Sequence, residues 1–261
     1  KMINFKDKFK NKLIKLGIKK GQTVILTIDL LKLILFLKSK KVKLDLNDII
    51  NPIKEIVSEN GNIVVYSFFW DFFKTNTFDY DNSKSASGSL SNFLLNDKEF
   101  KRTQNPVYSL LVWGKDKEKI YRMKHNDCFS KNSPFGYLIN KKSKLLFVNI
   151  DFKKTGFPFF HLAEQEVGVY YRFFKIFSGK FIKNKKKRDI SIKMYVRKKN
   201  YKILTYYSDH IERILQKKKS LKKVKDFGSE SSLIDLKTLY DLTIKQLKIE
   251  KKMFLQKETK I

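Results

Sequence analysis

Two short apolar runs, separated by helical patterns, constrain the fold of this chain more than any other feature. Residues 23–28 and 63–66 are rich in β-branched side chains, which is typical of strands buried inside a sheet. Between them lie helical patterns at residues 30–37 and 47–58, and Asp29 can cap the first of these. Because strands that alternate with helices usually pair in parallel, we predict a three-layer α/β/α fold around a mainly parallel sheet.

The segment after residue 179 has a different pattern. Residues 180–197 alternate apolar and basic side chains around a charged centre, which predicts an antiparallel hairpin. Helical patterns follow at residues 208–217 and 232–247. We therefore predict a core, residues 1–179, and a small C-terminal α+β subdomain, residues 180–261, packed together as one structural domain.

One long stretch, residues 67–87, has no clear period and is rich in aromatic, Asn, Asp and Ser residues. A loop of that length in a compact domain is usually functional or disordered. The aromatic side chains argue against disorder, so we expect this loop to contribute to a site or to a lid. The aromatic residues at positions 68–73 are candidates for ligand contacts or for packing within the lid.

A histidine and a glutamate three residues apart form the strongest catalytic candidate. A helix over residues 159–175 would place His161 and Glu164 on one face, because residues three apart are neighbours on a helix surface. The carboxylate could then hold one ring nitrogen and leave the other free to accept a proton, as in an oriented general base. A purely structural pair has the same spacing, so spacing alone leaves both roles open.

The remaining candidates for nucleophilic or metal chemistry are weaker. Cys128 is the only cysteine, so no internal disulfide can form, and we expect it to be structural. His125 lies in a basic loop, where it is either solvated or near a substrate, and His210 has the surroundings of a surface residue. No spacing resembles a zinc site, and we predict no metal.

The charge balance favours anionic ligands. The chain has 57 Lys and Arg against 26 Asp and Glu, a formal charge of +31. Such an excess attracts polyanions, although a general bias in composition produces the same excess without a polyanionic partner. A nucleic-acid-binding protein is therefore the rival class, with residues 183–188 as its basic patch and Tyr195 and Tyr201 for stacking.

No apolar run is long enough to cross a membrane, and residues 1–20 are amphipathic without a signal-peptide core. With the single cysteine, this leads us to expect a cytoplasmic protein without a membrane partner. We expect a monomer or a homodimer.

Five separated stretches match motifs of one known family. They are residues 21–24 followed by Asp29 and Leu30, Asp79 followed by S-x-S-x-x-G-x-L at 83–90, R-T-Q-N-P-V-Y-S at 102–109, S-P-F at 133–135, and H-L-A-E at 161–164. In this order they resemble the aminoglycoside 3-N-acetyltransferase family over residues 20–180, and more closely its sugar-modifying members.

The resemblance implies an α/β/α fold and acetyl transfer from acetyl-CoA to a sugar amine. It implies that His161 is the general base and that Glu164 orients it. The coenzyme contacts it implies are Asp29, Leu30, Ser83, Ser85, Gly88 and Leu90.

The chain departs from the family pattern at two positions. Asn105 replaces the usual histidine of the third motif, and Ile28 replaces a serine in the turn after the first strand. Coenzyme contacts at that turn would therefore have to come from the backbone.

Charge also bears on the acceptor. Aminoglycosides are polycations, which a protein of charge +31 repels at long range, whereas a nucleotide-linked amino sugar is attracted. We therefore expect a nucleotide-linked amino sugar of surface polysaccharide synthesis, with Asp79, Asp81 and Asn105 as substrate contacts. An aminoglycoside acceptor is the alternative.

Overall fold

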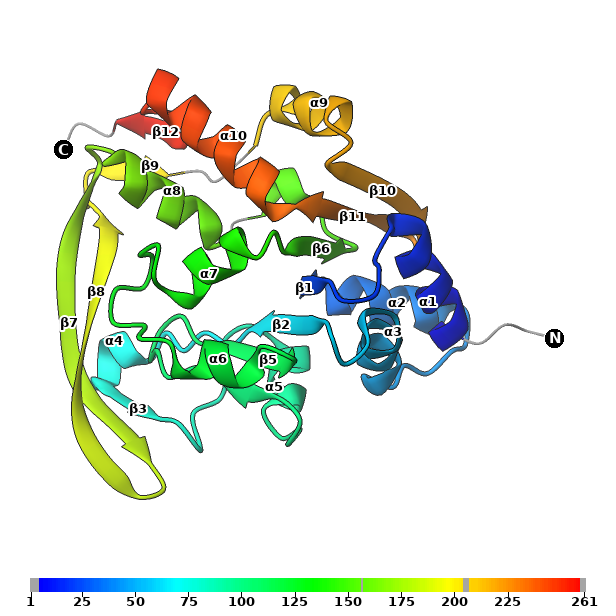
Figure 1. Cartoon of the computed structure of the whole chain (residues 1–261), viewed down its shortest axis with the longest axis horizontal. Helices are drawn as coiled ribbons and strands as arrows, with labels where there is room; N and C mark the ends of the chain where they lie inside the picture. The colour runs from blue at the N-terminus through cyan, green and yellow to red at the C-terminus, as the bar shows by residue number, and fades with distance from the viewer. Residues whose placement is uncertain (1–4, 156, 204–206, 259–261) are drawn as a thin grey trace.

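The computed structural model describes residues 5–155, 157–203 and 207–258. In this part of the chain a seven-stranded sheet, in the order β10-β11-β6-β1-β2-β5-β4, forms the centre of the molecule (Figure 1). Its middle strands, β6 (Lys144–Val148), β1 (Thr23–Ile28) and β2 (Asn62–Tyr66), pair in parallel. The predicted α/β fold with a parallel centre is confirmed.

Antiparallel strands extend the sheet on both sides. On the side of β2 lie β5 (Leu110–Gly114) and β4 (Lys101–Arg102). On the side of β6 lie β11 (Ser229–Asp235) and β10 (Leu221–Asp226). The C-terminal segment therefore completes the main sheet and does not only pack on it.

Alternation along the central strands produces two hydrophobic cores, one on each face of the sheet. Val24 and Leu26 belong to one core, and Ile25 between them belongs to the other. The first core is closed by α1 (Phe5–Leu16), α2 (Leu30–Ser39), α3 (Asn47–Val57) and α5 (Ser89–Leu94). The second is closed by α6 (Lys117–Arg122), α7 (Pro134–Asn140), α8 (Phe159–Val167), α9 (Asp209–Lys217) and α10 (Leu236–Ile249).

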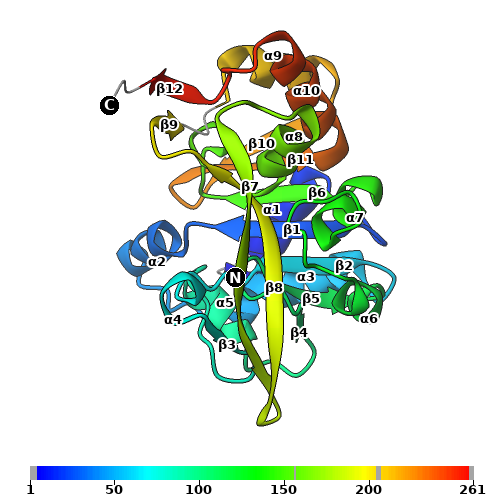
Figure 2. The ribbon, with the colours of Figure 1, turned by 90° about the vertical axis from the view of Figure 1, so that its left-hand side faces the viewer.

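A long hairpin, β7 (Arg172–Lys183) and β8 (Lys186–Arg197), runs along one side of the molecule (Figure 2). It forms a second sheet with β3 (Thr77–Asp79), which follows the short helix α4 (Phe72–Thr75). Near the C-terminus, β9 (Tyr201–Ile203) pairs with β12 (Leu255–Glu258). The hairpin was expected to start at residue 180, but β7 starts earlier and runs unbroken through residue 179.

Two expected helices are shorter than their patterns. The helix expected over residues 159–175 ends at Val167, because Gly168 adopts the left-handed conformation (φ 69°) and its amide closes the last turn on Glu164 O. The helix expected from residue 232 starts at Leu236, because residues 232–235 belong to β11 and pair with β6. In both places strand pairing overrides a local helical pattern.

None of the described helices combines the length and apolar character that a membrane crossing requires.

Candidate active site

The pair predicted from the sequence is formed at the start of α8. Nδ1 of His161 lies 3.0 Å from Oε2 of Glu164. The histidine side chain keeps 19% of its surface exposed, whereas the glutamate side chain is fully buried. The buried carboxylate therefore accepts the Nδ1 proton, which leaves Nε2 of a partly open ring as the acceptor.

Two further side chains hold the same carboxylate. The hydroxyl of Tyr171 donates to Oε1 of Glu164 at 2.8 Å, and Nε of Arg172 lies 2.8 Å from Oε2. The Arg172 N–H direction departs from that of a hydrogen bond, so this contact is an ion pair. The guanidinium also donates to the backbone oxygen of Tyr195 at 3.1 Å, which ties the site to β8.

The early end of α8 is what brings these partners to Glu164. Because the helix stops at Gly168, the chain can turn back, and Tyr171 and the first residue of β7, Arg172, then face the carboxylate. Sequence reasoning missed both residues. A helix continued to residue 175 would have placed them elsewhere, so no signal in the helical pattern could have found them.

The surroundings fix the protonation states. Burial and the charge of Arg172 lower the pKa of His161 to about 4, against the opposing effect of Glu164. Burial raises the pKa of Glu164, but the hydrogen bond from His161 and the charge of Arg172 outweigh it, and the pKa is lowered overall. At neutral pH the carboxylate is therefore charged and the imidazole neutral. Phe129 and Phe160 pack against the ring, with centroids 5.1 and 3.9 Å from its own.

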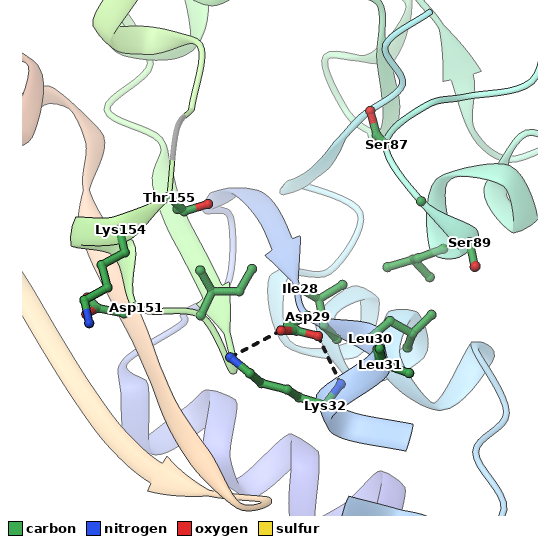
Figure 3. Close-up of a pocket in the computed structure, with 13 residues that line it drawn as sticks. Ile28, Asp29, Leu30, Leu31, Lys32, Ser87, Ser89, Asp151, Lys154 and Thr155 are labelled. Carbon is green, nitrogen blue, oxygen red and sulfur yellow. Dashed lines mark hydrogen bonds and ion pairs between the residues drawn. The ribbon is translucent and has the colours of Figure 1, made fainter. Parts of the chain in front are cut away.

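A cavity of about 610 Å³, which we call the first cavity, lies at the carboxyl ends of β1 and β6 (Figure 3). These ends are adjacent because Ile28 pairs with Val148. Ligands of open α/β sheets usually bind at this edge. Four of the expected coenzyme residues line it: Asp29, Leu30, Gly88 and Leu90.

Asp29 caps α2, as expected. Its side chain accepts from the backbone amide of Lys32 at 3.0 Å and lies 3.3 Å from the Lys32 ammonium (Figure 3). The Asp29 carboxylate is therefore already hydrogen-bonded within the protein, and the Lys32 ammonium balances its negative charge at the cavity wall.

The other two expected coenzyme residues, Ser83 and Ser85, do not line the cavity. The Ser83 hydroxyl accepts from the Asp79 amide, and the Ser85 hydroxyl accepts from Ser87 N and Ser91 Oγ. They stabilise the loop, and the later members of the Ser-rich segment, Ser87 and Ser89, face the cavity instead (Figure 3).

The opposite wall of the first cavity comes from the segment after β6, which sequence reasoning did not assign. Asp151, Lys154 and Thr155 line it, around the short 3₁₀ helix η1 (Phe152–Lys154). The chain then leads from this wall into α8. His161 itself does not line the first cavity. For Asp151, Lys154 and Thr155, the only signal in the sequence was their position after a central parallel strand.

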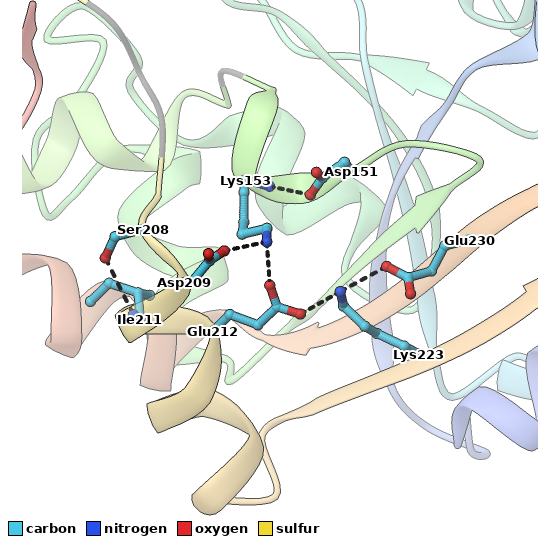
Figure 4. A network of polar contacts seen from close by, with 8 residues as sticks. All are labelled: Asp151, Lys153, Ser208, Asp209, Ile211, Glu212, Lys223 and Glu230. Carbon is cyan, nitrogen blue, oxygen red and sulfur yellow. Dashed lines mark hydrogen bonds and ion pairs between the residues drawn. The ribbon is translucent and has the colours of Figure 1, made fainter.

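An ion-pair network holds this wall in place (Figure 4). Nζ of Lys153 lies 2.6 Å from carboxylate oxygens of both Asp209 and Glu212 on α9. Lys223 on β10 also pairs with Glu212, and with Glu230 on β11 at 2.7 Å. The C-terminal elements thereby support the cavity wall.

The three expected substrate residues have partners within the protein. Asp79 accepts from the amides of Asp81 and Asn82, and Asp81 accepts from Asn184 N at the hairpin tip at 2.7 Å. Asn105 is only 1% exposed; it donates to His125 O and accepts from two backbone amides. Asn105 therefore holds the backbone of its own loop together by hydrogen bonds and does not face a cavity.

Two side chains near Asn105 can also be compared with expectation, those of His125 and Cys128. His125, expected in a solvated loop, is 5% exposed, because its ring packs against Phe135. Cys128 is buried, and burial raises the pKa of its thiol to about 12, so it is an inert structural thiol as expected. Within the described ranges, no cluster of three or more His, Cys, Asp or Glu side chains could hold a metal ion.

Comparison with known proteins assigns the family. The profile of the family described as aminoglycoside 3-N-acetyltransferase matches residues 36–248. The SPbeta prophage-derived aminoglycoside N(3')-acetyltransferase-like protein YokD of Bacillus subtilis (strain 168) is 26% identical over 175 residues, which are 58% of this chain and 61% of that protein. The aligned part is thus less than two thirds of this relative's length.

Solved structures share the fold at low identity. The crystal structure of YokD from Bacillus subtilis has a TM-score of 0.75 and 20% identity, covering 97% of this chain and 96% of its own. AAC-VIa bound to sisomicin has a TM-score of 0.77 at 16% identity, covering 94% and 97%. AAC-IIIb in a binary complex with CoASH has a TM-score of 0.75 at 16% identity, covering 97% and 98%. Because the family profile spans well over half of its length, the chain belongs to the aminoglycoside 3-N-acetyltransferase family.

Proposed function

We propose that this protein is an N-acetyltransferase that uses acetyl-CoA to acetylate the amine of an amino sugar, with aminoglycosides as the acceptor class. Family membership supports the reaction and this acceptor. The observation that carries the proposal is a partly open imidazole held at 3.0 Å by a buried carboxylate.

In this proposal His161 accepts the proton that the amine must lose. The neutral ring offers Nε2 as the acceptor, and Glu164 stabilises the imidazolium as it forms. As the nitrogen–carbon bond forms and the carbon–sulfur bond breaks, the proton passes through His161 to the departing sulfur. Tyr171 and Arg172 act indirectly, because they hold the Glu164 carboxylate in position.

The first cavity fits the arm of an elongated anionic thioester, which supplies the activated acetyl group when bound. Because His161 does not line this cavity, the acetyl end would have to extend beyond it to reach the imidazole. The first turn of α2 contributes Leu30 and Leu31 to the wall, and amides of a first turn have no partner within the helix. Lys154 adds positive charge. The hydroxyl of Thr155 can hydrogen-bond a pantetheine arm, and that of Ser87, which already accepts from Phe68 N at 2.9 Å, can donate to it. Ile28 in place of serine leaves the backbone to make the contact at the turn after β1.

The test is the turnover of His161→Ala. We expect kcat with acetyl-CoA and an aminoglycoside to fall by about 10²–10⁴, the usual contribution of a general base. The melting temperature should stay near that of the wild type. His210→Ala is the matched control, because His210 is exposed on α9 and should leave kcat unchanged. Near-wild-type turnover of the purified His161 variant would refute the assignment.

Glu164→Gln separates orientation from base chemistry. The amide oxygen can still accept from Nδ1 of His161, so we expect a smaller loss of kcat than for His161→Ala. Equal losses would show that the two residues act as one unit.

A nucleotide-linked amino sugar is the second candidate acceptor, and the net charge of +31 is the observation that favours it. A panel that compares kcat/KM for aminoglycosides and for nucleotide-linked amino sugars decides between the two. Turnover of the nucleotide-linked amines alone would replace the aminoglycoside assignment.

A further inference from the structure

A second cavity, of about 620 Å³, lies next to the first cavity and shares Leu30 and Ser89 with it. It is formed by α2 and the segment that follows this helix. Since the two cavities have walls in common, one elongated ligand can occupy both. We call the cavity formed by α2 and the segment after it the second cavity.

The walls of the second cavity combine two kinds of side chain. Lys38, Lys41 and Lys43 line it, and none of the described residues adds a carboxylate to its lining. Its other walls are mostly apolar and include Ile34, Val42 and Leu44. A site of this kind suits a ligand that has both a flat apolar ring and negative charge.

The three lysines are unpaired, in contrast to the lysines of the cavity-wall network. All three are exposed, and within the described ranges no carboxylate lies within ion-pair distance of their ammonium groups. Lys153, by comparison, is held between two carboxylates. The charge of the second cavity is therefore available to an external anion.

Lys41 occupies a position that usually belongs to glycine. Its φ is 56°, in the left-handed region. Lys41 N donates to Lys38 O at 3.0 Å and Val42 N donates to Leu37 O at 2.9 Å, which together form a Schellman motif at the end of α2. Glycine would close this motif without strain, so Lys41 adopts this conformation at an energetic cost.

We propose that the second cavity holds the 3′-phosphoadenosine end of coenzyme A, with Lys41 and Lys43 pairing with its 3′-phosphate, while the diphosphate lies at the shared wall beside the first turn of α2. The adenine ring would pack against the apolar walls, and the pantetheine arm would continue past Leu30 and Ser89 into the first cavity. This inference rests on the proposed use of acetyl-CoA, and it adds the residues that recognise the nucleotide end.

The test compares the Kd of coenzyme A with that of dephospho-coenzyme A, which lacks the 3′-phosphate, by titration calorimetry. We expect the wild type to bind coenzyme A about tenfold more tightly, as for one charge-assisted contact. In Lys41→Gly this ratio should fall toward one, while the melting temperature stays equal or rises because the left-handed strain is removed.

Lys40→Ala is the matched control. Lys40 is exposed in the same segment but does not line the second cavity, so its loss removes the same charge and should preserve the ratio. Equal loss of the ratio in both variants would indicate a general field and would overturn the site.

The remaining outcomes are also decisive. If the wild type binds both coenzymes equally, the inference fails while the proposed acetyl donor stands. If it binds neither, both proposals fail. If Lys41→Gly keeps the ratio but loses binding to phosphatidylglycerol vesicles, the lysines serve an anionic membrane surface and the coenzyme assignment is wrong.

Discussion

Three side chains converge on the carboxylate of Glu164, and this convergence explains the chemistry of His161. A lone buried carboxylate would be costly, but His161, Tyr171 and Arg172 together satisfy it. This arrangement makes His161 less basic, because burial and the charge of Arg172 both lower the pKa of its ring. The site therefore keeps the imidazole neutral well below neutral pH.

Replacement of Arg172 tests this balance. Because burial and the Arg172 charge together lower the pKa of His161 to about 4, Arg172→Gln should raise that pKa toward its ordinary value of about 6.5. The acid limb of kcat/KM should then move to higher pH. Arg172→Lys keeps the charge and should leave the limb near its wild-type position. An unmoved limb in Arg172→Gln would show that Arg172 only supports the fold.

His125 should make the fold sensitive to acid. Burial lowers the pKa of His125 to about 3, and its Nδ1 has no hydrogen-bond partner among the residues that the structure describes. The unfolded chain takes up this proton below pH of about 6.5 and the folded chain only near 3, so stability falls as pH decreases through this window. The contribution of His125 to the loss at pH 5 should be about 2 kcal/mol relative to pH 7, in addition to that of His161.

Urea unfolding at pH 7, 6 and 5 measures this loss. His125→Phe preserves the ring packing on Phe135 and should remove the part of the dependence that comes from His125, leaving the part that comes from His161, whose pKa is also lowered. Exposed His210→Gln should leave the whole dependence in place. A dependence that is the same in all three proteins would assign the acid sensitivity to other groups.

At the scale of elements, the sequence predicts best where one local signal decides. The β-branched side chains of residues 23–28 predict a buried strand, which the structure confirms, and Asp29 caps the next helix with the hydrogen bond that its side chain suggests. The hairpin was found from its alternation, but its start was placed too late. Aromatic residues at 170–177 suit a helix or a strand equally, and only pairing with β8 decides.

The same limit explains what was missed at the site. Ser83 and Ser85 match the family pattern, and Ser87 and Ser89 lie close to them in the sequence. Only the folded loop shows that Ser87 and Ser89 line the cavity, since internal hydrogen bonds involve the hydroxyl of Ser87 as well as those of Ser83 and Ser85. Arg172 meets Glu164 through a turn, and such a contact has no signature in sequence spacing.

Gly179 illustrates a strand position that requires glycine. A Cβ there would lie 2.2 Å from Asn76 O, a backbone atom that also accepts from Lys180 N at 2.7 Å. Gly179→Ala should therefore push β3 from β7 and lower the free energy of unfolding by about 1–3 kcal/mol. Ser178→Ala, the exposed neighbour, should cost less than about 0.5 kcal/mol. Urea unfolding distinguishes them, and equal effects would refute the clash.

At the scale of the whole molecule, the positive field raises the question of nucleic acid. The hairpin tip is basic, but Tyr195 is 8% exposed and donates to Val169 O, so it cannot stack with a base. Phe173 and Phe174 on β7 are exposed and are the rings that the rival function would use.

Thermal shifts decide between specific and general attraction. At physiological salt, coenzyme A should raise the melting temperature, because a ligand that binds only the folded state stabilises it. Single-stranded DNA should do so only at low salt, since a purely electrostatic contact weakens steeply as salt rises. A DNA-induced shift that persists at high salt, with none from coenzyme A, would support the nucleic-acid-binding class.

The pairing of β11 with β6 has a consequence for biosynthesis. β6 lies beside β1 at the centre of the sheet, yet its other neighbour comes from close to the end of the chain. While the ribosome is still making the segment between them, β6 presents an open edge with unpaired amides and carbonyls, which is a template for another nascent chain. Shielding of this edge by a chaperone, until β11 emerges, would be most valuable when many ribosomes translate one message.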